Sequence, residues 1–188
     1  MGEDVIALWE ETAVSPQGWG GSYVLRLQVH TDLSVSFGRF RGGEPIAVPV
    51  GSYVYVGSAL RGLGPRLLRH AARSESAPQA IYPLLHRQLQ VWGALSPGWQ
   101  PRRKTVRWHV DYLLQETAVS LTHVLALRSQ RPLEAQVARL LLADAGIRPL
   151  APGLGASDDP GQTHLLRIPD GLDCWHRLSA VIIANLQE

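Results

Sequence analysis

Residues 51–70 predict a strand, a glycine-rich turn and the start of a helix, and this unit constrains the fold more than any other part of the sequence. The β-branched and aromatic residues at 54–56 favour a strand. Glycine and serine interrupt that pattern from 57 to 64, and Pro65 is a suitable first residue for a helix. We therefore expect the strand to end at a glycine and the helix to begin soon after it.

The predicted helix has one basic face. Arg66 and His70 are four residues apart and share a side, with Arg69 and Arg73 on nearly the same side, whereas leucine and alanine occupy the other. Such a face is ordinarily a solvated surface. Arg66, however, directly follows Pro65, at a position where exposed backbone N–H groups disfavour a cation. Because breaches of local preference tend to mark functional sites, we interpret this face as a candidate site.

The composition is that of one folded domain. A chain of 188 residues, 45% hydrophobic and 18% charged, is large enough for one substantial core and short for two domains. We expect an N-terminal lead-in over 1–20 and a single domain over 21–188, with an inserted segment at 74–105 and a C-terminal helix at 172–187. Cys174 is the only cysteine in the sequence, which excludes an intrachain disulfide and a cysteine-cluster metal site.

Apolar periodicity predicts an α+β fold. The expected strands cover 22–29, 33–40, 46–50, 53–57, 119–127 and 163–168, and the expected helices cover 81–92, 131–146 and 172–187 besides the one that opens at Pro65. The strand residues expected to share a face are Tyr23, Leu25, Leu27 and Val29; then Tyr53, Tyr55 and Gly57; then Val119, Leu121, His123, Leu125 and Leu127. The apolar sides expected for the second and last helices are Ile81, Leu84, Leu85, Leu89 and Trp92, and Trp175, Leu178, Val181, Ile182 and Leu186.

Several short motifs resemble the GIY-YIG nuclease superfamily. Tyr55-Val56-Gly57, followed by Arg66 and His70, resembles the second half of its signature, and Gly21-Ser22-Tyr23 resembles the first half, with Ser22 where isoleucine or valine is usual. The fuller resemblance, over roughly 21–168, is to a subgroup long described as a domain of unknown function. The segments that carry it are residues 53–59, 108–113, 155–158 and 164–165.

This resemblance implies a GIY-YIG-like fold, a small mixed or antiparallel sheet flanked by helices, with 74–105 inserted. It also implies a divalent-metal-dependent endonuclease that hydrolyses DNA. The hydroxyls of Tyr23 and Tyr55 would meet near the attacking water, with His70 beside them, and Arg66 would neutralise phosphoryl charge. On its own, a strand tyrosine is ordinarily a packed side chain with its hydroxyl at the edge.

The resemblance also implies one late glutamate that ligates Mg²⁺ or Mn²⁺. Glu134 is the candidate, although glutamate in a first helical turn equally stabilises the helix end. Asp111 is the reserve metal ligand. His109 and Asp111 could hold a metal together if the segment is extended, whereas a helix would point them apart. The turn at 154–160 presents carboxylates that either cap their own backbone or assist the metal.

Substrate contacts are expected from the glycine turn, the basic helix face and the basic run before Trp108. Basic residues interleaved with an aromatic suit a nucleic-acid backbone and a stacked base, although a solvated loop has the same pattern. His109 in this group equally fits a packed, hydrogen-bonded supporting role. The candidate substrate-binding residues are Gly57, Ser58, Arg69, Arg73, Arg102, Arg103, Lys104, Arg107 and His109.

The function that the resemblance implies is DNA cleavage, and the alternative is a binding module that keeps the fold and the basic groove without hydrolysis. The net charge of +2 is too small to indicate nucleic acid by itself. No nucleophile elbow, phosphate-binding lysine loop, zinc-protease pair or dinucleotide fingerprint competes with this reading. The start of the chain lacks a signal-peptide pattern and no run is long enough for a membrane span, so a cytoplasmic protein without a membrane partner is expected.

Overall fold

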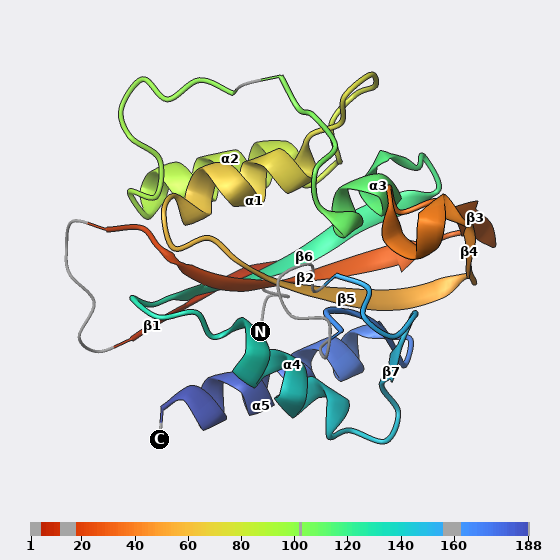
Figure 1. Cartoon of the computed structure of the whole chain (residues 1–188). Helices are drawn as coiled ribbons and strands as arrows, with labels where there is room; N and C mark the ends of the chain where they lie inside the picture. Colours follow the sequence, from red (N-terminus) through yellow and green to blue (C-terminus); the bar gives the residue numbers. More distant parts are fainter. Residues whose placement is uncertain (1–4, 12–17, 102, 156–162, 188) are drawn as a thin grey trace.

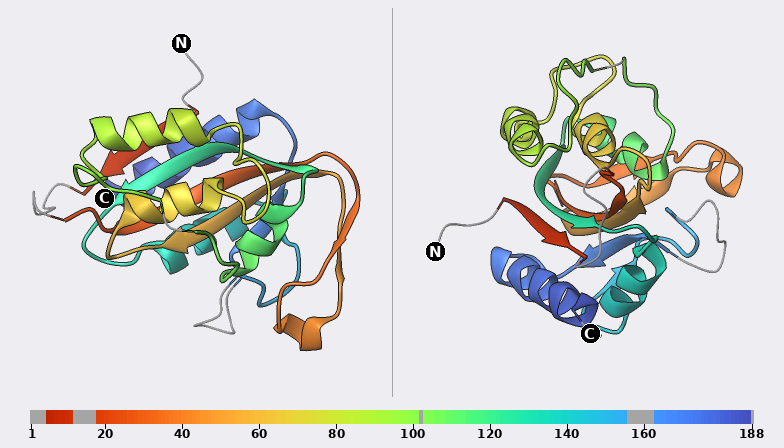
Figure 2. Two further views of the ribbon diagram at one scale, coloured as in Figure 1. Left: turned by 90° about the horizontal axis from the view of Figure 1, so that it is seen from above. Right: turned by 90° about the vertical axis from the view of Figure 1, so that its left-hand side faces the viewer.

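The computed structural model describes residues 5–11, 18–101, 103–155 and 163–187. As predicted, the fold is α+β: a mixed six-stranded sheet lies between two layers of helices, and a small two-stranded sheet sits at one end (Figures 1 and 2). The large sheet has the order β1-β6-β2-β5-β8-β7, with β1 parallel to β6 and the other neighbours antiparallel. Its strands are β1 (Ile6–Glu10), β2 (Gly21–Val29), β5 (Gly51–Ser58), β6 (Val119–Arg128), β7 (Arg148–Pro149) and β8 (Leu165–Ile168).

Helices cover both faces of this sheet. On one face lie α1 (Leu63–Ala71), α2 (Tyr82–Val91) and α3 (His109–Gln115), and on the other lie α4 (Glu134–Leu142) and α5 (Leu172–Leu186) (Figure 1). The small sheet pairs β3 (Leu33–Val35) with β4 (Ile46–Val48), and the short 3₁₀ helix Phe40–Gly43 joins them. None of the helices among the described residues is long and apolar enough to cross a membrane.

The central pair β2 and β5 confirms the predicted alternation. Tyr23, Leu25, Leu27 and Val29 are buried in the cluster beneath α1, α2 and α3, together with Tyr53 and Tyr55 of β5. The intervening residues Val24, Val54 and Val56 are buried in the second cluster, beneath α4 and α5. Because both faces of these strands are covered, nearly every residue in them is buried.

The predicted single face of β6 is wrong because the strand contains a bulge. Pairing with β2 shifts between Arg26 and Leu27, which oppose His123 and Leu121, so Thr122 is an extra residue on β6. Val119 and Leu121 therefore belong to the cluster under α1, α2 and α3. After the bulge the odd-numbered residues face α5 instead: Leu125 and Leu127 join the second cluster, and the His123 ring lies 5.6 Å from that of Trp175.

Two predicted boundaries at the start of the chain are also corrected. The lead-in expected over 1–20 contains β1, whose residues Ile6–Glu10 pair with Val124–Arg128 of β6 and so extend the main sheet. The strand expected over 33–40 ends at Val35, because β3 pairs only with β4 and the chain then turns into the 3₁₀ helix. An alternating apolar pattern in the sequence can therefore extend beyond the residues that pair with a neighbouring strand.

Helix α1 begins two residues earlier than Pro65. Gly62 precedes it with a φ of 91°, a left-handed conformation that favours glycine, and the Trp19 carbonyl oxygen accepts hydrogen bonds from the backbone N–H groups of Gly62 and Leu63 at 3.1 and 2.8 Å. Arg66 is consequently the fourth residue of the helix, and its own N–H donates to Gly62 O at 3.2 Å. Arg66 therefore does not lie among the exposed N–H groups at the start of the helix, and its expected unfavourable position there is wrong.

The inserted segment forms the expected helix, α2, which packs beside α1 (Figure 2). Leu85 and Leu89 are fully buried, whereas Leu84, expected on the same side, is 37% exposed. A similar correction applies to α5, in which Val181 is 41% exposed and Cys174 is buried instead. The buried stripe of α2 is therefore narrower than the sequence pattern predicted, whereas that of α5 is shifted towards Cys174.

We expect Leu85→Ala to lower the free energy of unfolding by about 2–5 kcal/mol, because it removes a fully buried side chain from the core shared by α1 and α2. Val91→Ala, on the same helix but 74% exposed, is the matched control and should change stability little. Urea unfolding measures both. Equal, small effects would show that the insertion is not an integral part of the core.

Candidate active site

A buried chain of hydrogen bonds joins three strand and helix residues that are distant in the sequence. The Tyr23 hydroxyl on β2 lies 2.8 Å from Nε2 of His70 on α1, and Nδ1 of His70 lies 3.1 Å from Oδ1 of Asp111 on α3. His70 and Asp111 are completely buried, as is Tyr23. Strand β2 positions the phenol, α1 positions the imidazole, and α3 positions the carboxylate.

The hydrogen-bond partners assign the tautomer of His70. An ionised Asp111 only accepts, so Nδ1 of His70 carries the proton and donates to it. Burial lowers the pKa of His70, against the raising effect of Asp111, so the ring is neutral at pH 7. Nε2 is then an acceptor, and the Tyr23 O–H donates to it. The Tyr23 hydroxyl therefore contacts one nitrogen of the His70 imidazole, and the Asp111 carboxylate holds the other nitrogen.

Asp111 is held ionised by an unusually complete set of donors. As the third residue of α3, it accepts hydrogen bonds at Oδ2 from the backbone N–H groups of Arg107 and Trp108, both at 3.1 Å. Lys104 Nζ lies 3.4 Å from Oδ1 and Arg69 Nη2 lies 3.6 Å from Oδ2. Burial alone would raise the pKa of Asp111, but His70, Lys104 and the Trp108 N–H together outweigh it and hold the pKa well below its usual range.

Trp108 organises the cations beside this chain. The guanidinium carbon of Arg66 lies 3.7 Å from the centre of the Trp108 ring, and those of Arg69 and Arg107 lie 4.9 and 5.2 Å away. The Trp108 ring also meets that of His70 edge-on, at 5.8 Å. One indole thus gathers three guanidinium groups next to the imidazole.

The two signature tyrosines lie together, as the resemblance implies. The rings of Tyr23 and Tyr55 are 6.2 Å apart, and that of Tyr55 is 6.1 Å from His70. Burial raises the pKa of both phenols, so both are protonated at neutral pH. The Arg66 guanidinium acts in the opposite direction and lowers the pKa of each phenol, but burial outweighs it.

Gly57 serves a different purpose from the one predicted. It pairs with Tyr23 across β2 and β5, and a Cβ added there would lie 2.5 Å from both Cζ and the hydroxyl oxygen of Tyr23. The close approach that this glycine allows is therefore that of the Tyr23 ring, not of a phosphate. Gly57 is a positioning residue for the phenol.

Glu134 belongs to a separate cluster at the end of β5. Its Oε2 accepts a hydrogen bond from the Ser58 hydroxyl at 2.6 Å, and its Oε1 lies 2.5 Å from His164 Nδ1. Helix α4 carries Glu134 on the opposite face of the sheet from α1 (Figure 1). The two clusters adjoin because Gly57, against which Tyr23 packs, is followed directly by Ser58, and the charge of Glu134 raises the pKa of both Tyr23 and Tyr55.

Several predicted substrate contacts prove to have structural partners. Arg73 donates to the carbonyl oxygens of Leu114, Glu116 and Val119 at 2.9–3.2 Å, so it secures the end of α3. Lys104 is buried, and donates to Ala72 O at 2.9 Å besides its contact with Asp111. Buried Lys104 thus has a carbonyl and a carboxylate as partners, and the carbonyl oxygens occupy Nε and Nη2 of Arg73.

Of the remaining basic candidates, Arg103 and Arg107 are exposed, and Arg66 and Arg69 are partly exposed. Arg69 also donates to the Thr105 carbonyl oxygen. Arg102 and residues 156–160 of the predicted carboxylate turn lie outside the described residues. The cationic surface that a polyanion can reach therefore centres on Trp108 and the guanidinium groups around it.

The structure does not support a metal site at His109 and Asp111. Helix α3 begins at His109, so the two side chains point apart, and Asp111 has no accessible oxygen. His109 Nδ1 instead accepts a hydrogen bond from the Gly155 N–H at 3.0 Å, which supports the turn after Ala151, and burial lowers its pKa. Among the described residues no group of three or more His, Cys, Asp or Glu side chains is arranged to hold a metal.

Residues 22–185 match the family described as "Domain of unknown function DUF123". The chain belongs to this family. No curated protein matches it, and no solved structure does. The description of the family names no activity, so its chemistry has to be inferred from the side chains assembled on this DUF123 fold.

The buried carboxylate of Asp111 should make a large contribution to the stability of this DUF123 chain. Asp111→Asn should lower the free energy of unfolding at pH 7 by about 3–5 kcal/mol, because it leaves Lys104 and Arg69 without their counter-charge. Asp144→Asn is the matched control: Asp144 pairs with Arg177 at the exposed surface, and its loss should matter little.

The same pair of variants has a predictable pH dependence. Because the folded pKa of Asp111 is depressed, its contribution is complete above its unfolded pKa of about 3.9 and is lost as pH falls further. The stability difference between the wild type and Asp111→Asn should therefore be full at pH 7 and shrink below about pH 4. Urea titrations across this range measure it, and a difference independent of pH would contradict an ionised Asp111.

The position of Gly57 should not tolerate a side chain without a loss of stability. Gly57→Ala should cost about 1–3 kcal/mol of stability, because the new methyl group overlaps the Tyr23 ring. In a Tyr23→Ala background the same change should cost much less, so a double-mutant cycle isolates the clash. Gly18→Ala, where nothing lies within 4 Å of the added carbon, is the control. Additive effects in the cycle would place the strain elsewhere.

Proposed function

We propose that this chain is a divalent-metal-dependent endonuclease that hydrolyses DNA phosphodiester bonds. The observation that carries the proposal is the buried Tyr23–His70–Asp111 chain beside Arg66. A phenol, a neutral imidazole and a carboxylate in series form a proton-transfer path, and a guanidinium stacked on an indole is suited to an anionic group. The signature-like spacing of Tyr23, Tyr55, Arg66 and His70 in the sequence supports the same activity.

In this mechanism the Tyr23 oxygen accepts a proton from the attacking water while its own proton passes to Nε2 of His70. The proton already on Nδ1 stays with the imidazole, and Asp111 stabilises the imidazolium that forms. The raised pKa of Tyr23 is compatible with this step, because the phenol exchanges one proton for another and need not exist as a free phenolate. Tyr55, 6.1 Å from the His70 ring, would orient the water.

Arg66 would neutralise the charge that develops on the phosphoryl group. Its contact with the Trp108 ring, at 3.7 Å, would hold the guanidinium group beside the phosphate. Arg69 and Arg107, on the same ring, would contact neighbouring phosphates. A DNA substrate agrees with the cytoplasmic location that the sequence predicts.

Glu134 would hold the metal. Mg²⁺ commonly keeps several waters and takes only one or two protein carboxylates together with substrate phosphate oxygens, so a single glutamate suffices. The Glu134 side chain is 22% exposed, and a carboxylate that bonds Ser58 and His164 still has free lone pairs. A metal there would supply Lewis-acid stabilisation of the leaving oxygen. Ser58 and His164 orient the carboxylate.

The second candidate function is a nucleic-acid-binding module without hydrolysis. The observation that favours it is that both carboxylate oxygens of Glu134 already have protein partners, on the face of the sheet opposite α1. A polyanion could still bind the guanidinium groups around Trp108. The two functions differ in whether DNA is cut.

Cleavage of supercoiled plasmid in Mg²⁺ or Mn²⁺ tests the proposal. Glu134→Gln should abolish metal-dependent nicking and keep much of the DNA affinity, because the change removes the charged metal ligand and leaves the guanidinium groups around Trp108 in place. Arg66→Ala should weaken binding and reduce nicking by at least about a hundredfold, since it removes transition-state charge stabilisation. Glu10→Gln on β1 and Arg139→Ala on α4 are the matched surface controls.

Each outcome identifies one function. Nicking by the wild type that is lost in both variants and kept in both controls supports the nuclease. Binding without nicking by the wild type supports the binding module. If Glu134→Gln and Arg66→Ala cleave like the wild type, the site assignment is wrong.

A further inference from the structure

A pocket of about 340 Å³ lies between α1, α2 and the segment that follows α2. Its walls include Pro65 and Leu68 of α1, Tyr82 of α2, and Trp99 and Pro101 of the following segment. Pockets of this size are typical of small-ligand sites. The inserted segment supplies the two aromatic walls, so this pocket is a product of the insertion.

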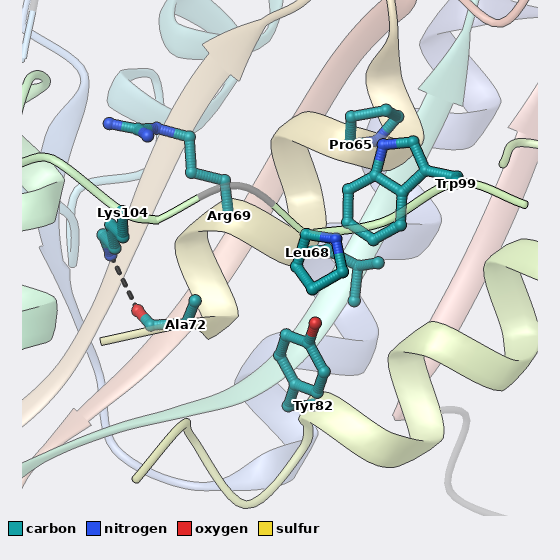
Figure 3. A pocket seen from close by; sticks show the side chains of 8 residues that line it. Pro65, Leu68, Arg69, Ala72, Tyr82, Trp99 and Lys104 are labelled. Carbon is teal, nitrogen blue, oxygen red and sulfur yellow. Dashed lines mark hydrogen bonds between the residues drawn. The ribbon is translucent and has the colours of Figure 1, made fainter. Parts of the chain in front are cut away.

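The two ends of the pocket differ in chemistry. Trp99 and Tyr82 lie at one end, and Lys104 and Ala72 at the other (Figure 3). His86 supports the aromatic end, because its ring lies 6.2 Å from those of both Tyr82 and Trp99. A planar ring that enters would therefore meet an indole and a phenol held in place by α2.

Arg69 connects this pocket to the candidate active site. It lines the pocket, lies over Trp108 at 4.9 Å, and pairs with Asp111. Asp111 is shared by Arg69 and Lys104, so this region keeps a net positive charge. Arg66 lies over the same Trp108 ring, which makes the guanidinium groups a continuous path from the active site to the mouth of the pocket.

We propose that the pocket takes one unstacked base of the DNA strand whose phosphates contact Arg66 and Arg69. Aromatic side chains bind unpaired bases of any sequence through their π faces, and guanidinium groups beside them bind the backbone. The pocket has both features, because Tyr82, Trp99 and Arg69 all line it. This inference rests on the proposed function and refines it: the substrate is DNA with an unpaired or displaced base near the cleavage point.

Binding of a DNA hairpin that carries one unpaired 2-aminopurine, in EDTA to prevent metal-dependent cleavage, tests the pocket. The wild type should bind it about tenfold more tightly than the fully paired hairpin and should quench its fluorescence by stacking. Trp99→Ala should lose both effects, and Trp99→Phe should keep most of them. Trp92→Ala is the matched control, because Trp92 follows the same helix and stacks on Trp19 outside the pocket.

A wild type that binds paired and unpaired hairpins equally, or a Trp99→Ala variant that keeps the preference while folded by circular dichroism, would overturn the base pocket. Plasmid nicking in Mg²⁺ tests the nuclease proposal independently of the base pocket. Nicking without base preference refutes the pocket alone. Base preference that depends on Trp99 without nicking of any DNA refutes the hydrolysis alone.

Discussion

The fully buried carboxylate of Asp111 is the interaction on which the arrangement above the sheet depends. It fixes His70 on α1 and draws in Lys104 and Arg69, and it receives the backbone N–H groups that begin α3. A charge so deep in the protein is tolerable only with this number of donors. Because His70 is held from that side, its other nitrogen can only face Tyr23. The same hydrogen bonds therefore join α1 and α3 and orient His70 towards Tyr23.

The end of β5 is where the two faces of the sheet meet. Gly57 makes room for the Tyr23 ring on one face, and Ser58, the next residue, donates to Glu134 on the other. Successive strand residues point to opposite faces, so one dipeptide can serve a proton-transfer chain and a carboxylate that come from different layers. A strand that continued regularly past Ser58 would separate the two. The chain instead turns at once into Gly62 and α1.

Local patterns predicted much of the fold, and distant pairings explain the rest. The core faces of β2 and β5 follow from period-two alternation, but the bulge at Thr122 depends on the pairing of β6 with β2. The cluster of Tyr23, Tyr55, Arg66 and His70 was reached through a resemblance, since no local rule joins residues 47 apart. The roles of Asp111, Trp108 and His164 were missed, because each depends on partners that only the folded chain brings near. The one local signal was the position of Asp111 three residues after Trp108, where an acid caps a helix.

The most direct measurement is a crystal structure of the protein with a DNA duplex and Mn²⁺, located by anomalous scattering. We expect a single Mn²⁺ bound to a carboxylate oxygen of Glu134. We also expect a phosphate that bridges this ion and Arg66, with the Tyr23 hydroxyl facing the phosphorus. A metal bound elsewhere, or DNA that contacts Trp108 and its arginines while Glu134 stays closed by Ser58 and His164, would contradict the hydrolytic site.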